Sequence, residues 1–158
     1  MHATLSYQMY QTNQSLETGL GFSYGVRSYN PFGLSGAGAR SKKRIVIVDD
    51  DQAIRKIYKN ALSYFGFDIL DTMSDGSEIV EKIDAMVPRP DVVILDERMP
   101  RMSGTEACRR IHASYPDVSV IFVSADSAAE KTALEAGANY FFKKPVSISE
   151  LARAIESV

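Results

Sequence analysis

The chain has 158 residues, of which 45% are hydrophobic and 24% charged, and its formal net charge at pH 7 is -2. These values are typical of one soluble globular domain and provide no basic field for nucleic acid or an anionic membrane. No apolar run approaches the roughly 20 residues of a membrane-spanning helix. A single cysteine, Cys108, excludes an internal disulfide, and the N-terminus lacks a secretory signal, so a cytoplasmic protein is expected.

Residues 1–40 differ in composition from the rest of the chain. They hold six of the ten glycines and only three charged residues of the Asp, Glu, Lys and Arg types. Neither a period of 2 nor a period of 3.6 is sustained, which predicts a disordered N-terminal extension. Its aromatic residues fit either contacts with a partner or a plain flexible tail. The folded domain is expected over residues 41–158.

Strand and helix patterns alternate from Ser41 onward. Short β-branched or apolar runs predict five strands, at residues 45–48, 67–70, 92–95, 118–123 and 140–142. The first helix should bury one apolar face, with Gly66 as its C-cap, and that face consists of Ile54, Ile57, Tyr58, Ala61, Leu62 and Phe65. The second helix should bury Ile79, Val80, Ile83 and Met86.

Three later helix starts are predicted from serines that precede a glutamate by three residues. Ser103, Ser127 and Ser147 all have this capping-box spacing. The last of these helices should bury Leu151, Ile155 and Val158. Five alternations of strand and helix predict an α/β fold, a doubly wound five-stranded parallel sheet with helices on both faces and the flavodoxin-like order 2-1-3-4-5.

The stretch "DVVILDERMP", residues 91–100, places an acid directly after a fully apolar strand. In this fold ligands gather outside the carboxyl ends of the strands, and other polar residues reach the same edge. The first strand runs into Asp49, Asp50 and Asp51, the fourth into Ser124 and the fifth into Lys144; the first helix is expected to be capped by Asp50 or Asp51. Each alone has a structural explanation, but together they indicate a site.

Electrostatics indicates what this site binds. Two unit charges about 5 Å apart repel by roughly 3 kcal/mol at an effective dielectric of 20, so Asp49, Asp50 and Asp96 would not be gathered for stability. A hard divalent cation explains them, and Mg²⁺ is favoured because it keeps room for a phosphoryl oxygen. Lys144 adds a positive charge and Ser124 a hydroxyl donor, which suits a phosphoryl group. The central carboxylate, Asp96, is the expected nucleophilic acceptor.

At this point the chain resembles a known family. The stretches "IVIVDDD", "VILDERMPRMSG", "VSA" and "GANYFFKKP" are similar to those of the receiver domain of two-component response regulators, and in particular to the stand-alone chemotaxis-type regulator. The resemblance runs from about residue 43 to residue 158. It implies a single-domain response regulator or phosphorelay receiver that is a phospho-acceptor rather than an enzyme, although it takes part in its own phosphorylation and dephosphorylation.

The resemblance also implies residue roles. Asp96 would be phosphorylated, Asp50 would bind Mg²⁺ directly, Asp49 would bind through water, and the main-chain carbonyl of Arg98 would complete the protein ligands. Lys144 would precede a cis peptide bond, with the side chain of Lys143 on the other face of the strand.

A switch follows from the same family logic. After phosphorylation the hydroxyl of Ser124 would move to the phosphoryl group and vacate space for Phe141. Many members have Tyr where this chain has Phe141, so only packing would signal the state; a plain core Phe is the alternative. A salt bridge between Arg98 and Asp126 is further expected to prolong the phosphorylated state, the alternative being two solvated side chains.

Other function classes fit less well. Three aspartates after the first strand would repel the phosphate of a flavin, and a dinucleotide-binding G-x-G-x-x-G motif is missing. A haloacid-dehalogenase-type phosphatase needs a second acid two residues after the nucleophile, where this chain has Arg98. The remaining alternative is a receiver-like interaction module that works without phosphate.

The resemblance implies the partners. A histidine kinase or histidine phosphotransfer protein would be the phosphoryl donor, and an unidentified downstream protein would read the changed surface. Neither nucleic acid nor a membrane is expected as a partner. Because the chain ends after the fifth helix, output by contact rather than through a second domain is expected.

Overall fold

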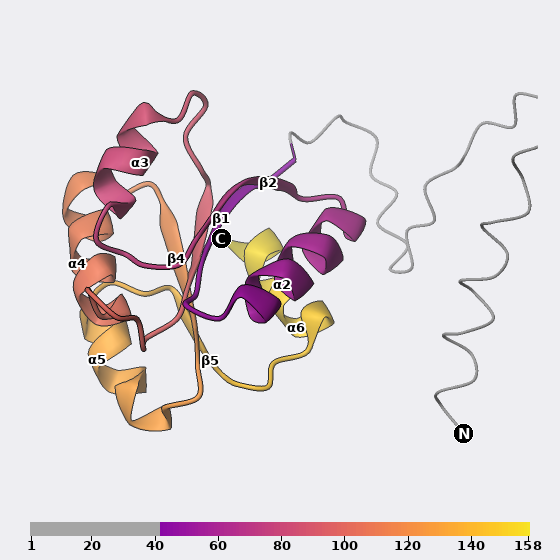
Figure 1. Cartoon of the computed structure of the whole chain (residues 1–158). Helices are drawn as coiled ribbons and strands as arrows, with labels where there is room; N and C mark the ends of the chain where they lie inside the picture. Colours follow the sequence, from indigo (N-terminus) through magenta and orange to yellow (C-terminus); the bar gives the residue numbers. More distant parts are fainter. Residues whose placement is uncertain (1–41) are drawn as a thin grey trace, which may run out of the picture. The chain divides into compact units, whose positions relative to one another are not determined.

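A computed structural model describes residues 42–158, so the predicted extension at residues 1–40 lies outside the described residues. One parallel sheet has the strand order β2-β1-β3-β4-β5, which confirms the predicted topology (Figure 1). The strands are β1 (Arg44–Val48), β2 (Asp68–Met73), β3 (Val92–Leu95), β4 (Ser119–Ser124) and β5 (Tyr140–Lys143). The helices are α2 (Gln52–Tyr64), α3 (Ile79–Ala85), α4 (Gly104–Ser114), the 3₁₀ turn η1 (Ser127–Ala129), α5 (Glu130–Glu135) and α6 (Ile148–Ser157).

Helices cover both faces of the sheet. Helices α2 and α6 lie on one face, and α3, α4 and α5 lie on the other (Figure 1). Alternate residues of each central strand therefore enter different cores: Ile45 and Ile47 of β1 pack toward α2 and α6, whereas Val46 and Val48 pack toward α3 and α4. A side chain of this size stabilises the fold by about 1.5–3 kcal/mol when fully buried. This two-sided burial explains the continuous apolar runs in the sequence.

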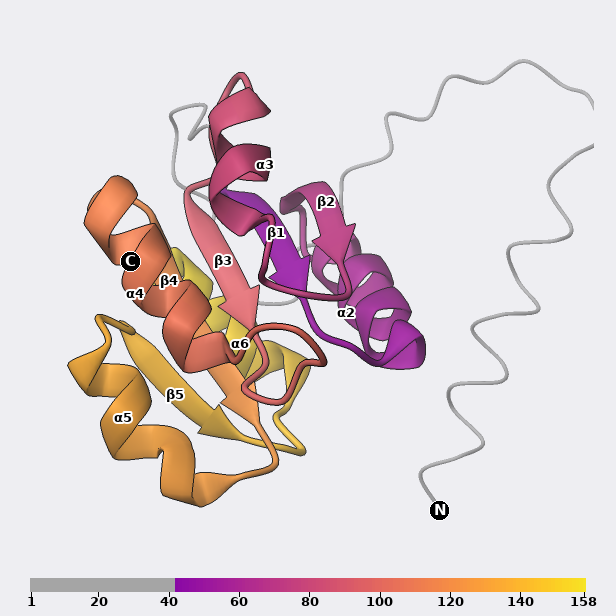
Figure 2. The ribbon, with the colours of Figure 1, turned by 60° about the vertical axis from the view of Figure 1, so that its left-hand side comes forward.

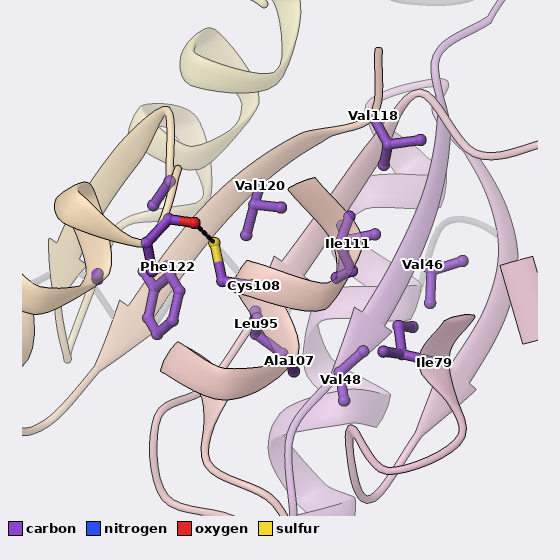
Figure 3. Close-up of a cluster of buried hydrophobic side chains, with 14 of the residues drawn as sticks. Val46, Val48, Ile79, Leu95, Ala107, Cys108, Ile111, Val118, Val120 and Phe122 are labelled. Atoms are coloured by element: carbon purple, nitrogen blue, oxygen red, sulfur yellow. Dashed lines mark hydrogen bonds between the residues drawn. The ribbon is translucent and has the colours of Figure 1, made fainter. Parts of the chain in front are cut away.

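The larger core cluster lies between the sheet and helices α3, α4 and α5 (Figure 3). Phe122, the largest of its fully buried side chains, comes from β4. Cys108 of α4 is fully buried there, and its Sγ donates a weak hydrogen bond to the Ala136 carbonyl at 3.5 Å. Burial raises the pKa of Cys108 to about 12, so this thiol is an unreactive packing group.

Most helix starts agree with the sequence. Asp51 caps α2 by accepting from the amides of Ala53 and Ile54, Ser103 caps α4, and Ser147 forms a complete capping box with Glu150. The prediction for Ser127 is wrong by one residue: the carboxylate of Asp126 accepts from the Ala128 amide, so Asp126 is the N-cap and Ser127 begins the 3₁₀ turn.

The predicted faces of the helices need one correction. Leu62 and Tyr58 are buried as expected, but Ile57 of α2 is 54% exposed. The stripe predicted for α2 was therefore wider than the surface that the sheet and α6 cover. At the other end of the chain, Leu151 and Ile155 are fully buried and Val158 packs partly buried against the same cluster. None of the helices between residues 42 and 158 has the length and apolarity that crossing a bilayer would demand.

Candidate functional site

The candidate site lies where the parallel strands end. Figure 2 shows the arrowheads of β1, β3 and β5 pointing the same way, so their carboxyl ends share one edge of the sheet. Asp49 directly follows β1, Asp96 follows β3, Ser124 is the last residue of β4, and Lys144 follows β5. The topology thus brings together side chains that are up to 95 residues apart in the sequence.

Three carboxylates form the centre of the site. Asp49, Asp50 and Asp96 each offer one oxygen, and these oxygens all lie within 4.8 Å of one another. Asp49 and Asp96 are buried, whereas Asp50 is exposed. The predicted clustering is therefore confirmed. Hard oxygen donors at this spacing are the ligand type that Mg²⁺ binds in proteins.

Lys144 faces this cluster, as predicted. Its Nζ lies 2.6 Å from Asp49 Oδ2 and 3.0 Å from Asp96 Oδ1. The Lys144-Pro145 peptide bond is cis, as the family resemblance implied, and Lys143 is exposed. One ammonium group thus binds two of the three carboxylates.

Burial and charge shift the ionisation of these groups. Burial raises the pKa of Asp49 above its usual value, although the hydrogen bond from Lys144 opposes this, and the nearby charge of Asp96 raises it further. For Lys144, burial lowers the pKa, but the hydrogen bonds to Asp49 and Asp96 outweigh burial, so the pKa is raised. The lysine therefore remains charged at neutral pH. Its single positive charge is fewer than the three carboxylates of the cluster would need for neutrality.

The main chain around Asp96 fixes the position of its carboxylate. The Asp96 amide donates to the Val48 carbonyl at 2.9 Å, and Asp96 Oδ2 accepts from the Arg98 amide at 3.1 Å. Helix α4 approaches so closely that a Cβ added to Gly104 would lie 2.1 Å from the Asp96 carbonyl oxygen. Only glycine fits at Gly104, because any side chain would collide with the backbone of the central acid.

Solvent reaches the cluster on the side of Asp50. A shallow cavity of about 480 Å³ opens there. It is lined by Asp50, Glu97, Arg98, Met99, Pro100 and Ser103. Of the three acids, Asp50 is the one that lines this cavity.

Ser124 and Phe141 occupy neighbouring strands beside the cluster. Ser124 is 1% exposed, and its Oγ accepts from the Asp126 amide at 3.1 Å. The ring of Phe141 is half-buried and stacks on Phe122 with centroids 6.3 Å apart. The switch that involves these two side chains stays a prediction.

The expected salt bridge between Arg98 and Asp126 is not formed. Among the ion pairs within 4.0 Å in residues 42–158, none joins these two exposed side chains. Asp126 instead uses its carboxylate to cap η1. The alternative of two solvated side chains describes this structure, and the bridge between them was a wrong prediction.

Two further acids near the site were missed from the sequence. Asp75, in the loop between β2 and α3, is 5% exposed and accepts from the amides of Ser77 at 2.7 Å and Arg101 at 2.8 Å. Glu97 Oε2 accepts from the amide and the hydroxyl of Thr105, each at 2.8 Å. Both therefore tie down the loop that follows Asp96. The Asp75-Gly76 turn signal after the second strand was visible in the sequence.

Comparisons with known proteins agree with this geometry. Residues 45–156 match the response regulator receiver domain family. The response regulator MprA of Mycolicibacterium vanbaalenii is 38% identical over 110 residues, covering 68% of this chain and 46% of that protein. MprA of Mycobacterium leprae is 36% identical over 117 residues, covering 73% of this chain and 50% of that protein. The chain spans about half the length of the curated relatives it matches.

Solved structures show the same fold. A CheY-like response regulator receiver domain protein from Methanospirillum hungatei superimposes with a TM-score of 0.68 at 31% identity, covering 74% of this chain and 93% of that one. The CheX-CheY-BeF3-Mg complex from Borrelia burgdorferi gives a TM-score of 0.67 at 32% identity, with coverage of 73% and 87%. Since the family match covers most of the chain and the strand order and acidic edge agree with it, this chain belongs to the response regulator receiver domain family.

Proposed function

We propose that Asp96 accepts a phosphoryl group from a phosphohistidine donor in a Mg²⁺-dependent reaction, and that the phosphorylated protein signals through contacts with another protein. The observation that carries this proposal is the position of Asp96 after β3, the middle strand of the sheet, between Asp49 after β1 and Ser124 at the end of β4. The carboxylate of Asp96 lies 3.0 Å from the ammonium group of Lys144 and within 4.8 Å of oxygens of Asp49 and Asp50. An acid between a lysine and two further acids is suited to transfer of a group that is itself negatively charged.

The residues present fit the metal that this reaction needs. Asp49, Asp50 and Asp96 offer hard oxygen ligands, and the carbonyl of Arg98 accepts no hydrogen bond from the residues that the structure describes. These four residues would hold Mg²⁺. When bound, the ion would supply positive charge that offsets the charges of the acids and of the incoming phosphoryl oxygens.

The chemistry of the transfer is simple. An oxygen of the Asp96 carboxylate attacks phosphorus, a P–O bond forms, and the P–N bond of the donor breaks. The electron pair returns to the imidazole nitrogen, which leaves as neutral histidine when its other ring nitrogen carries a proton. Lys144 lies beside Asp96 Oδ1 and offsets the charge that the acyl phosphate adds. The hydroxyl of Ser124 would donate to a phosphoryl oxygen, and Phe141 would fill the space that it leaves.

A histidine kinase or a histidine phosphotransfer protein is the proposed donor. The domain acts as a phospho-acceptor that helps catalyse its own modification, and not as an enzyme that turns over a separate substrate. The family membership supports this assignment. The single-domain organisation and the cytoplasmic location stay predictions, which the mass and the cell fraction of the native protein would test.

Acetyl phosphate provides a direct test. The wild-type protein, Asp96→Asn and the control Asp117→Asn, an exposed acid before β4, would be incubated with acetyl phosphate with and without Mg²⁺. We expect one added phosphoryl group by mass spectrometry in the wild type and in the control, only with Mg²⁺, and none in Asp96→Asn. Equal labelling of all three proteins, or no labelling of the wild type, would leave a phosphate-independent interaction module as the better description.

A further inference from the structure

Arg55 of α2 makes an unusual set of contacts directly behind the acidic cluster. Its Nη1 donates to the carbonyl of Asp49 at 2.5 Å and to the carbonyl of Asp50 at 3.0 Å. The side chain is half-buried, and within residues 42–158 no carboxylate lies close enough to form an ion pair with it. One nitrogen of a cationic side chain thus donates to two successive main-chain oxygens.

These two carbonyls control the direction of Asp50. The carbonyl of Asp49 belongs to the peptide group before the Asp50 Cα, and the carbonyl of Asp50 belongs to the peptide group after it. One guanidinium that holds both groups restricts the two backbone dihedrals of Asp50 at once. The Asp50 side chain itself has no hydrogen-bond partner in the described part of the chain, so only the backbone sets the direction in which this side chain leaves the chain.

Asp49, in contrast, is held in several independent ways. Its amide donates to the Met73 carbonyl at 3.1 Å, its Oδ1 accepts from the Asp51 amide at 2.9 Å, and its Oδ2 accepts from Lys144 at 2.6 Å. Loss of Arg55 would therefore leave Asp49 nearly in place and would weaken the hold on the backbone of Asp50, where only the Asp51 amide would still fix the peptide group that follows. The acid most exposed to the solvent side of the site is the one that depends on Arg55.

We propose that Arg55 is a positioning residue for the cation site: it holds the peptide groups on both sides of Asp50 and so directs the Cα–Cβ bond of this acid toward the site before Mg²⁺ binds. The inference rests on the proposed function, because it assumes that Asp50 is a ligand. An ordered ligand loses less conformational entropy on binding, and residues behind metal ligands commonly change metal affinity by 10- to 100-fold. The guanidinium also places a positive charge behind acids that repel one another.

Magnesium titration of the whole chain tests the proposal without any phosphoryl donor. Isothermal titration calorimetry with MgCl₂ would compare the wild type with Arg55→Lys and Arg55→Gln. The control is Arg153→Gln, because Arg153 also donates to a main-chain carbonyl, that of Ser149 at 3.3 Å, but on α6. We expect a Kd roughly 10-fold higher in both Arg55 variants and an unchanged Kd in the control.

Each other outcome decides the question. If both Arg55 variants fold and bind Mg²⁺ as the wild type does, Arg55 does not position Asp50. If Arg55→Lys binds normally and Arg55→Gln does not, the charge matters and the two-carbonyl contact does not, which also overturns the proposal. Circular dichroism in EDTA would show whether the two variants fold. If neither folds, Arg55 is needed for the fold itself, and the proposed positioning role is overturned. Failure of the wild type to bind Mg²⁺ would instead refute the proposed function.

Discussion

Charged side chains are paired at the amino ends of strands β1 and β3 and are in excess at the carboxyl ends. At their amino ends, Arg44 and Asp91 form a matched pair. Nε of Arg44 lies 2.9 Å from Oδ2 of Asp91, Nη2 lies 2.6 Å from Oδ1, and the Arg44 amide also donates to Oδ2 at 2.8 Å. At their carboxyl ends, three acids share one lysine. The charges of the matched pair neutralise each other, whereas the excess negative charge at the carboxyl ends is neutralised only when a positively charged ligand binds.

The ionisation of two aspartates shows the same difference. The hydrogen bond from Arg44 lowers the pKa of Asp91 below its usual value, and this outweighs the opposite effect of burial. For Asp49 burial has the larger effect, and the pKa is raised in spite of Lys144. The same residue type, at opposite ends of neighbouring strands, is thus stabilised as an anion in one place and destabilised in the other. Excess charge marks the functional end of this sheet.

Glycines also differ between the two ends, and the largest predicted effect follows from them. Gly66, near the amino ends, has a φ of +95° and open space around its missing Cβ. Gly104, at the site, would place a Cβ 2.1 Å from the Asp96 carbonyl oxygen. We expect Gly104→Ala to destabilise the protein by about 3 kcal/mol through overpacking, and Gly66→Ala by about 1 kcal/mol through its backbone conformation. Urea unfolding in EDTA would measure both, and an equal loss in the two variants would contradict the close approach.

Breaking the matched pair should have the next largest effect. Arg44→Met removes a charged donor of two side-chain hydrogen bonds, which should lower the free energy of unfolding at pH 7 by about 2 kcal/mol. The pKa of Asp91 is lower in the folded state, so its stabilisation is present above the unfolded value of about 3.9 and is lost as the pH falls through the folded value. The difference from wild type should therefore shrink below about pH 4. A loss that is independent of pH would refute this account.

At the carboxyl ends of the strands, removal of a charge should increase the stability of the protein. Asp50→Asn removes one of three neighbouring negative charges and no hydrogen bond of the side chain, so stability in EDTA should rise by about 1 kcal/mol at low salt, and less at high salt. The control is Asp117→Asn, which removes an exposed acid far along the sequence. In Mg²⁺ the order should reverse, because only the wild type would be stabilised by the bound ion. If Asp50→Asn destabilises the protein in EDTA, repulsion among the acids is not significant.

Much of this architecture could be predicted from the sequence because strands buried on both faces leave an unambiguous signal. The predicted bounds of the strand at residues 92–95 are those of β3, and the topology that follows places Asp49, Asp96 and Lys144 at one edge. Patterns of residue type are sufficient for this level of description.

Contacts to main-chain groups could not be predicted in the same way. Arg55 binds carbonyls and Asp75 binds amides. The residue type does not determine the direction in which a peptide group points. The wrong salt bridge between Arg98 and Asp126 has the related cause that a nearby amide can take the place of a charged partner. The capping position at Ser127 failed similarly, since Asp126 offered a competing carboxylate one residue earlier.

The smallest predicted effect belongs to Ile57, which lies at neither end of the strands and was wrongly assigned to the buried face of α2. Because this side chain is 54% exposed, Ile57→Gln should change the free energy of unfolding by less than about 0.5 kcal/mol. Leu62→Ala, on the buried face of the same helix, should cost about 3 kcal/mol. Urea unfolding of both variants would check the assignment. A loss at Ile57 comparable to that at Leu62 would mean that another part of the protein covers this face in solution.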